Sequence, residues 1–353
     1  MADLIIERRE GLYCPPGDFY IDPSRPVPRA VITHAHADHA RGGHGRVLAA
    51  ADGAGLLRVR LGATLPLQTL RYGEVVVERG VRISLHPAGH VLGSAQVRLE
   101  YGGQVWVVSG DYDCRADGEA NPTCTAFEPV RCDCFVTEST FGLPVYRWPR
   151  QALVFEAIQA WWQANAALGR ASVLRGYSLG KAQRLLAGLE AMAGPIVVHP
   201  AVRAVNQAYL AAGVRLPATL GLDTLPGGRL PAGALVVAPP GLRGGPYAAT
   251  LAGAAEAFAS GWMLLRGGRA RRGGGMGFVL SDHADWDGLT RAIAATGAHR
   301  VIVMHGQAQP LARWLQAQGL QAGLFGTAYG GEGEPAERAG AQADGADSLS
   351  TPA

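Results

Sequence analysis

The chain has 353 residues, of which 17% are charged and 49 are glycine, and its formal net charge is +3. This length exceeds one ordinary hydrophobic core, so we expect two domains or one domain interrupted by another, and the mild charge does not by itself indicate a nucleic-acid partner. No apolar run reaches membrane-spanning length and the first ten residues lack the apolar core of a signal peptide, so the simplest expectation is a cytoplasmic protein without a membrane partner.

The densest group of metal-binding side chains is the sequence THAHADHARGGH, which follows the apolar run 30–32. That run is typical of a buried strand, so His34 and His36 should project from one face of extended backbone, where one metal ion can bind both. Asp38 and His39 come after the strand has ended and should face a neighbouring position. Burying three imidazoles and a carboxylate without a cation is costly, and the pattern therefore predicts a site for two metal ions.

Three further side chains at expected strand ends can complete this site. His90 lies in a loop rich in Gly and Pro and can join the first metal. Asp111 ends a buried-strand pattern, and its two carboxylate oxygens allow it to bridge two cations. His305 ends the apolar run 301–304 and offers the second metal an imidazole, although an ordinary loop histidine is an equal alternative for this residue alone.

Hydrophobic periodicity divides the chain into blocks. Up to residue 145, strand-like runs alternate with glycine turns, and from residue 150 helices and strands alternate as in a parallel sheet. The residues assigned to metal lie outside this second block, and the chain then returns to the site through His305. The expected elements are a helix near 52–61, strands at 82–85, 96–100 and 105–108, a helix at 150–167, a strand at 171–174, a helix opening near 179–183, a strand at 196–198, a helix at 201–212, strands at 235–238 and 277–280, a helix near 285–296 and a strand at 300–304.

The five cysteines are expected to be free thiols. Their number is odd and no secretory signal is recognised, which disfavours a disulfide framework. Cys132 and Cys134 lie two residues apart, but a structural zinc site normally requires a second such pair, so partly buried thiols are favoured over a zinc site.

Six short motifs resemble those of a known enzyme fold. The HAHADH cluster, GHVLGSA at 89–95 and SGD at 109–111 are similar to successive motifs of the metallo-β-lactamase fold. TESTFG at 137–142, SDHAD at 281–285 and MHG at 304–306 are similar to the three additional motifs of its β-CASP branch, which processes nucleic acids. The resemblance runs from about residue 12 to about residue 330. It is closest to the DNA-ligase-associated exonucleases of bacteria, through the strings LYCPPGDFYIDP at 12–23, FGLPVYRW at 141–148 and LSDHADW at 280–286.

The resemblance implies an α/β protein with an αββα metallo-β-lactamase sandwich and an inserted α/β β-CASP cap. The expected divisions are a first part of the metallo-β-lactamase domain at 1–148, the cap at 149–265 and the returning part at 266–330. Residues 331–353, rich in Ala, Gly, Asp and Ser, are expected to form a disordered tail.

The resemblance also assigns roles in the site. The first metal takes His34, His36, His90 and Asp111, and the second takes Asp38, His39, Asp111 and His305. Asp38, Glu138 and His283 are the expected catalytic residues, with Glu138 holding one tautomer of His283 so that this histidine acts as the general acid. Asp22 should orient a ligand histidine from outside the coordination shell. The two ions are Zn²⁺ or Mn²⁺, because imidazole and carboxylate ligands without thiolate suit either.

A group of arginines on a Gly-rich segment precedes the His283 motif. Its members are Arg266, Arg269, Arg271 and Arg272. A run of charged residues usually forms a surface exposed to water, and that alternative stays open here. Guanidinium groups, however, bind phosphate oxygens well, and beside a site that cleaves phosphodiesters these arginines favour contacts with nucleic acid. Arg147 and Trp148, where the cap begins, are candidates to grip and stack on a terminal nucleotide, although Trp148 could equally pack at a domain interface.

The expected reaction is phosphodiester hydrolysis by a hydroxide that two metal ions activate. His305 in the last motif favours RNA as the substrate, but the ligase-associated strings span more of the chain and favour DNA. We therefore expect a DNA exonuclease that works in end processing and repair, 5′ to 3′, with a DNA ligase and a helicase as functional partners. A β-CASP ribonuclease is the alternative. A small-molecule hydrolase such as a thioesterase or lactamase is less favoured, because a small substrate needs no such cap.

Overall fold

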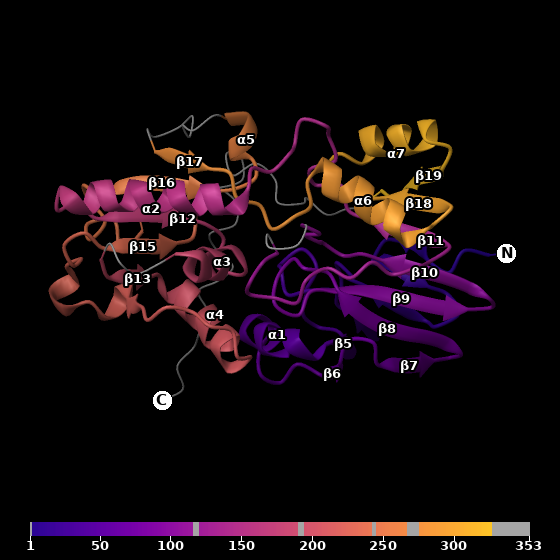
Figure 1. Cartoon of the computed structure of the whole chain (residues 1–353). Helices are drawn as coiled ribbons and strands as arrows, with labels where there is room; N and C mark the ends of the chain where they lie inside the picture. The colour runs from indigo at the N-terminus through magenta and orange to yellow at the C-terminus, as the bar shows by residue number, and fades with distance from the viewer. Residues whose placement is uncertain (1, 116–119, 190–193, 242–244, 267–274, 327–353) are drawn as a thin grey trace.

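A computed structural model describes residues 2–115, 120–189, 194–241, 245–266 and 275–326. The expected α/β class is confirmed, because helices and three separate β-sheets make up the described chain. Figure 1 shows two lobes, one with two of the sheets and one with the third, and the chain crosses from the first lobe to the second and back. None of the described helices combines the length and hydropathy needed to cross a membrane.

The first lobe is built on two sheets packed face to face. One consists of β1 (Ile6–Arg8), β2 (Gly11–Cys14), β3 (Phe19–Ile21), β4 (Arg29–Val31), β5 (Arg46–Ala50) and β6 (Leu67–Leu70), in that order. The other, in spatial order, consists of β19 (Gln321–Leu324), β18 (Arg300–Val303), β11 (Cys134–Thr137), β10 (Gln104–Val108), β9 (Ala95–Tyr101), β8 (Val81–Pro87) and β7 (Val75–Glu78). Apolar side chains such as Ile21 and Val31 from the first sheet and Val97 and Val136 from the second form one core between them.

Helices cover the outer face of each sheet in this lobe. The 3₁₀ turn η1 (Ala51–Gly53) leads into α1 (Ala54–Leu61), whose Leu56 and Leu57 pack on the first sheet. On the second sheet lie α6 (Trp286–Thr296) and α7 (Ala308–Ala317). Asp285 caps α6 by accepting a hydrogen bond from the Gly288 amide at 2.8 Å, which satisfies one of the free amides of its first turn. The layers are thus helix, sheet, sheet and helices.

The second lobe, which we call the cap, contains one parallel sheet. Its strands in spatial order are β14 (Leu220–Gly221), β13 (Ile196–Val198), β15 (Leu235–Ala238), β12 (Ser172–Arg175), β16 (Ala255–Ala259) and β17 (Met276–Phe278). Its helices are α2 (Gln151–Ala167), α3 (Lys181–Gly188), α4 (Pro200–Ala211) and α5 (Met263–Arg266), with 3₁₀ turns η2 (Leu222–Thr224) and η3 (Pro226–Gly228). β17 pairs with β16, so this sheet extends to Phe278, beyond the boundary expected at residue 265.

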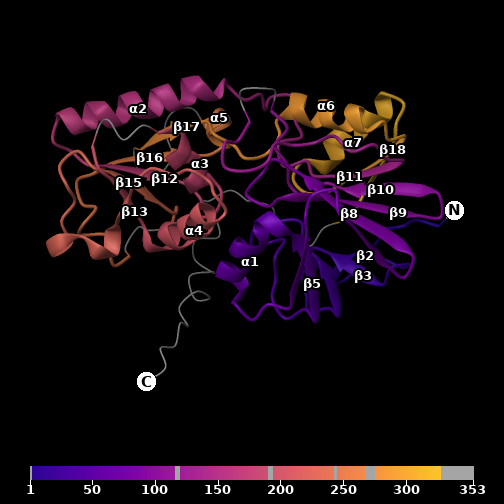
Figure 2. The same ribbon diagram turned by 60° about the horizontal axis from the view of Figure 1, so that its bottom comes forward.

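The cap contacts the first lobe through α4. Val205 and Tyr209 of this helix join the apolar cluster formed by α1 and the first sheet, and the Leu92 amide donates to the Tyr209 hydroxyl at 3.3 Å. Figures 1 and 2 both show α1 and α4 side by side where the lobes meet. The loops that follow β12 and β17 also return to the first lobe, and they reach the group of histidines described below.

The periodicity located the long elements well. The helices expected at 150–167, 201–212 and 285–296 correspond to α2, α4 and α6, and the strands expected at 196–198 and 235–238 coincide with β13 and β15.

All five cysteines are free thiols, as expected.

Candidate metal centre

Loops after four strands of the two-sheet lobe converge at one buried place. His34 follows β4, His90 follows β8, Asp111 follows β10 and His305 follows β18. The loop carrying Asp111 lies very close to the loop carrying His34, since a Cβ added at Gly110, whose φ is +57°, would stand 2.7 Å from the Thr33 Cβ. Glycine at this position therefore permits the approach of the two loops that brings the carboxylate to the histidines.

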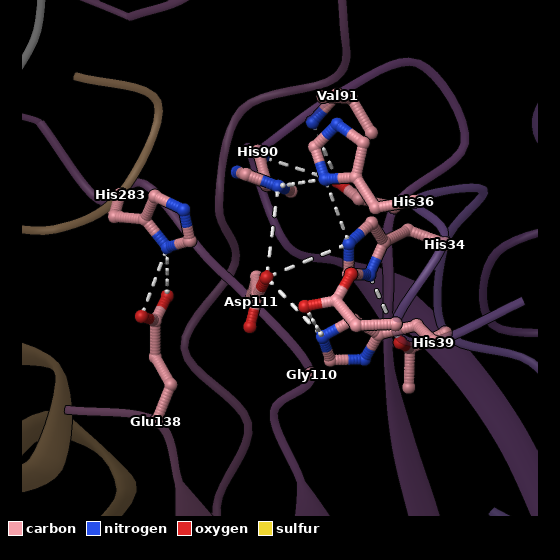
Figure 3. Close-up of polar contacts among 12 residues, drawn as sticks. His34, His36, His39, His90, Val91, Gly110, Asp111, Glu138 and His283 are labelled. Atoms are coloured by element: carbon pink, nitrogen blue, oxygen red, sulfur yellow. Dashed lines mark hydrogen bonds and ion pairs between the residues drawn. The ribbon is translucent and has the colours of Figure 1, made fainter. Parts of the chain in front are cut away.

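The residues expected for the first metal have donor atoms grouped as a small ion requires. His36 Nδ1 lies 3.1 Å from His34 Nε2 and 3.0 Å from His90 Nε2. Asp111 Oδ2 lies 3.5 Å from His34 Nε2 and 3.9 Å from His90 Nε2 (Figure 3). Four ligands of a tetrahedral zinc ion, at about 2.0–2.2 Å from it, stand about 3.4 Å from one another. The donor set therefore fits a divalent cation.

The residues expected for the second metal form a more open group beside the first. His39 Nε2 lies 3.3 Å from Asp111 Oδ2 and 3.8 Å from Asp38 Oδ2. The ring of His305 lies 5.6 Å from the ring of His39, centroid to centroid. The Asp38 side chain is 23% exposed, and His36 of the first group is also only partly buried, whereas the His34 side chain is fully buried. Each group therefore has a residue that reaches solvent. The same oxygen of Asp111 contacts both groups.

Burial and neighbouring charges give these side chains the protonation states that a metal requires. Burial, with the nearby histidines, lowers the pKa of His90 to about 3 and that of His305 to about 4, and it holds the pKa of His34 well below its ordinary value. Burial alone would raise the pKa of Asp111, but the adjacent His39 holds it well below its ordinary value. Neutral imidazoles and an ionised carboxylate at neutral pH are the forms that coordinate cations.

His39 differs from the other histidines because three carboxylates surround it. Burial would lower its pKa, but Asp111, Asp38 and Asp22 raise the pKa well above the ordinary value. Without a cation, a proton on His39 balances these negative charges. A divalent cation between Asp38, His39 and Asp111 would take over that role, and binding should release the proton.

Asp22 lies behind His39, at the end of β3. Its Oδ2 contacts His39 Nδ1 at 2.7 Å, while its two oxygens also accept hydrogen bonds from the Thr33 amide at 2.8 Å and the Thr33 hydroxyl at 2.6 Å. This arrangement holds the imidazole so that Nε2 faces Asp38 and Asp111, as the expected orienting role requires.

Replacement of Asp22 tests that role. We expect Asp22→Asn to weaken metal binding at the second position by about 10–100-fold, because the amide cannot supply the charge that orients His39, while binding at the first position changes little. Asparagine tolerates the φ of +45° at this residue, so the fold should persist. Metal affinities measured by competition with a chelator report the result, and equal loss at both positions would contradict the assignment.

Glu138 and His283 form a second polar pair next to Asp111. His283 Nδ1 lies 3.0 Å from Oε1 and 2.9 Å from Oε2 of Glu138. The carboxylate of Glu138 also accepts from the Tyr112 amide at 2.7 Å and the Thr140 hydroxyl at 2.6 Å, so its position is fixed. One ligand atom each of Asp111, Glu138 and His283 lies within 4.8 Å of the others. Figure 3 shows this pair beside the histidine cluster.

Of the residues expected to contact nucleic acid, the structure describes Arg147, Trp148 and the backbone of Arg266. Trp148 packs edge-on against Phe141, and its indole donates to the His283 carbonyl at 2.9 Å, which is an interface contact. The Arg147 side chain is 62% exposed and pairs with Asp287 at 3.1 Å. Arg266 is the last residue of α5, and Arg269, Arg271 and Arg272 lie outside the described residues.

The structure adds a group of buried charged residues that sequence reasoning missed. Lys181 and Arg184 of α3 contact Asp282, which precedes His283, and Arg184 also contacts Asp113. Lys181 is 3% exposed and Arg184 is fully buried. From the sequence, both residues resemble the polar side chains of an ordinary helix. The one sequence feature that could have indicated this group is the position of Asp282 next to His283.

Comparisons with known proteins identify relatives of this chain. A protein named "Probable DNA ligase" from Opitutus terrae is 33% identical over 318 residues, which are 90% of this chain and 30% of that protein. "Endoribonuclease ysh1" from Emericella nidulans is 33% identical over 133 residues, 36% of this chain and 14% of that protein. "Cleavage and polyadenylation specificity factor subunit 3" from Dictyostelium discoideum is 28% identical over 122 residues, 34% of this chain and 15% of that protein. The chain thus spans less than a third of the length of each relative.

A solved structure shares the fold. A protein of unknown function from Enterococcus faecalis V583 aligns with a TM-score of 0.54 and 12% sequence identity, over 80% of this chain and 76% of that one. No protein-family model matches the sequence. At this identity, the structural likeness shows similarity of fold alone.

Together, the site and the relatives confirm the resemblance to the β-CASP branch of the metallo-β-lactamase fold that the motifs indicated. The match that covers 90% of this chain to a protein named "Probable DNA ligase" agrees with the ligase-associated strings.

Proposed function

We propose that this protein is a metal-dependent nuclease that hydrolyses phosphodiester bonds in DNA, as an exonuclease that prepares ends for ligation. The observation that carries the proposal is the position of Asp111. It belongs to the group His34, His36 and His90 and also to the group Glu138 and His283, so one carboxylate joins a cation site to a fixed histidine–carboxylate pair. Metal-assisted hydrolysis of a phosphodiester can use these two parts, a cationic clamp and a proton donor.

Each group has a defined part in this proposal. Cations bound by His34, His36, His90 and Asp111, and by Asp38, His39, Asp111 and His305, supply a water of lowered pKa and neutralise charge on the phosphate. Glu138 accepts from His283 Nδ1, which leaves Nε2 as the ring atom that can give a proton to the departing oxygen. The negative charge of Glu138 also favours the doubly protonated imidazolium, in which Nε2 carries the proton to be given. The identity of the ions as Zn²⁺ or Mn²⁺ is part of the proposal.

The choice of DNA rests on the relatives. The protein that matches 90% of this chain is named a DNA ligase, whereas the endoribonucleases match about a third of it. Joining to a ligase in one polypeptide would bring end trimming and sealing together, and we therefore propose a DNA ligase as a functional partner. We also propose a helicase as a functional partner and 5′ to 3′ as the direction of digestion. A ribonuclease is the second candidate, favoured by His305 and by the endoribonuclease names.

The decisive experiment compares substrates. The full chain, stripped of metal and reloaded with Zn²⁺ or Mn²⁺, is incubated with single- and double-stranded DNA and RNA labelled at the 5′ or the 3′ end, with a chelated sample as the control. We expect DNA to be shortened from one end, with release of the 5′ label as mononucleotides, and no cleavage after chelation. Cleavage of RNA alone would support the second candidate, and cleavage of neither polymer would overturn the proposal.

A further inference from the structure

Two histidines of the first metal position, His36 and His90, contact backbone carbonyls in the two loops that follow strands of the cap. His36 and His90 face the metal position through Nδ1 and Nε2, which lie 3.0 Å apart. Their other nitrogens contact backbone carbonyls, His36 Nε2 that of Leu179 at 3.2 Å and His90 Nδ1 that of Asp282 at 2.7 Å. In the tautomers that leave the facing nitrogens free for a cation, the far nitrogens carry the protons and donate to these carbonyls.

Leu179 belongs to the cap and is tightly placed. It precedes Gly180, which has a φ of +86° and donates its amide to Gln183 Oε1 at 2.8 Å at the start of α3. A Cβ at Gly180 would stand 2.4 Å from Val91 Cγ1, so the beginning of α3 lies directly against the loop that carries His90. The start of α3 therefore holds the carbonyl of Leu179 close to this loop.

Asp282 is held by the same helix. Lys181 Nζ lies 2.7 Å from its Oδ2, and Arg184 Nη1 lies 3.0 Å from its Oδ1. Arg184 Nη1 also donates to the Ser281 carbonyl at 2.6 Å, next to the peptide whose carbonyl meets His90. Removed from water, such charged pairs fix geometry more strongly than surface pairs do. The first two turns of α3 thus set both carbonyls.

We propose that helix α3 of the cap positions His36 and His90, so that docking of the cap and binding of the first metal stabilise each other. Lys181 is then a positioning residue, which acts through Asp282 on His90. The proposal rests on the metal function proposed above, and linkage requires the effect to be reciprocal. His39 of the second metal position contacts Asp22, Asp38 and Asp111, all of the first lobe, so we expect this position to depend less on the cap.

The test is Lys181→Met in the full chain, which removes the charge and keeps an apolar stem of similar length. Zn²⁺ affinities are measured by chelator competition, and the visible spectrum of bound Co²⁺ reports ligand geometry. We expect one of two binding events to weaken by about 10–100-fold and the Co²⁺ spectrum of that event to change, while the other event keeps its affinity. Lys181→Arg should restore most of the affinity, because a guanidinium can also reach Asp282.

Two further variants keep the test decisive. Asp282→Asn retains the carbonyl that meets His90 but loses both charged partners, so it should reproduce the defect even if Lys181→Met folds poorly. Arg203→Met removes the surface pair of Arg203 with Asp223 (2.6 Å) in the same lobe and should change neither affinity. Wild-type affinities at both positions in folded Lys181→Met and Asp282→Asn would overturn the positioning role and leave the proposed function standing. Absence of metal binding by the wild-type protein would overturn the proposed function itself.

Discussion

Asp111→Ala is expected to abolish nuclease activity and to weaken binding of both metal ions. One oxygen of this carboxylate lies 3.5 Å from His34 Nε2 and 3.3 Å from His39 Nε2, so both donor groups lose a ligand and their only shared negative charge. Loss of a direct ligand should cost more than the about 10–100-fold that is typical of a partner outside the coordination shell. Cleavage of labelled DNA and metal content per chain are the measurements.

Asp133→Asn is the matched control for this variant. Asp133 lies at the opposite end of the same sheet, where its carboxylate accepts from the Val105 amide at 2.7 Å, and its replacement should leave cleavage near the wild-type rate. Near-normal turnover by Asp111→Ala would show that Asp111 is not shared by the two positions. Loss of folding, detected by circular dichroism, is separated from loss of metal by repeating the test with Asp111→Asn, which preserves side-chain volume.

His283→Ala is expected to slow cleavage by about 10²–10⁴-fold while the protein keeps its full metal content. His283 contacts Glu138 at 2.9 Å, and these two side chains and Asp111 could themselves hold an ion. The proposed function makes His283 a proton donor and not a ligand, and its loss should then leave both ions bound. The defect should shrink on a nitrophenyl phosphodiester, whose leaving group needs no proton. Rates on the two substrates and metal content by mass spectrometry test these points.

His299→Ala removes an exposed histidine from the same lobe and should leave both rates unchanged. If His283→Ala loses a metal ion, the residue is a ligand. If it slows both substrates equally, His283 positions the phosphate and is not the general acid.

The residues that the sequence brings together are those at the ends of apolar runs. Two mostly buried strands are formed by the apolar runs at 105–108 and 301–303. Because the residues that follow such strands lie at one edge of the sheet, the positions of Asp111 and His305 in the site could be predicted from the sequence. The parallel sheet of the cap was likewise predictable from helices alternating with short β-rich runs. β7 was not among the predicted strands although it begins with three consecutive valines, which are exposed or only partly buried in the structure. Its place at the edge of the sheet follows from its pairing with β8.

The contacts between the lobes could not be predicted. The contacts are a backbone carbonyl of Leu179 with His36 and a buried ion pair between Lys181 and Asp282, and each joins segments a hundred or more residues apart in the chain. The start of a helix with one lysine has no distinctive sequence pattern. Backbone atoms carry no residue identity, so a carbonyl that orients a ligand is invisible in a sequence. A strand at 277–280 was predicted from the sequence, but its pairing with β16 joins segments far apart in the chain and has no sequence signal of its own.

The most direct test of the account is the rate of DNA cleavage as metal is returned to the stripped protein. We expect no cleavage of end-labelled DNA without metal and a rate that rises until two equivalents of Zn²⁺ or Mn²⁺ have been added. A rate that reaches its maximum after one equivalent would contradict the shared role of Asp111. Cleavage at the full rate without metal, or none at any metal concentration, would contradict the assignment of the site as a metal-dependent nuclease centre.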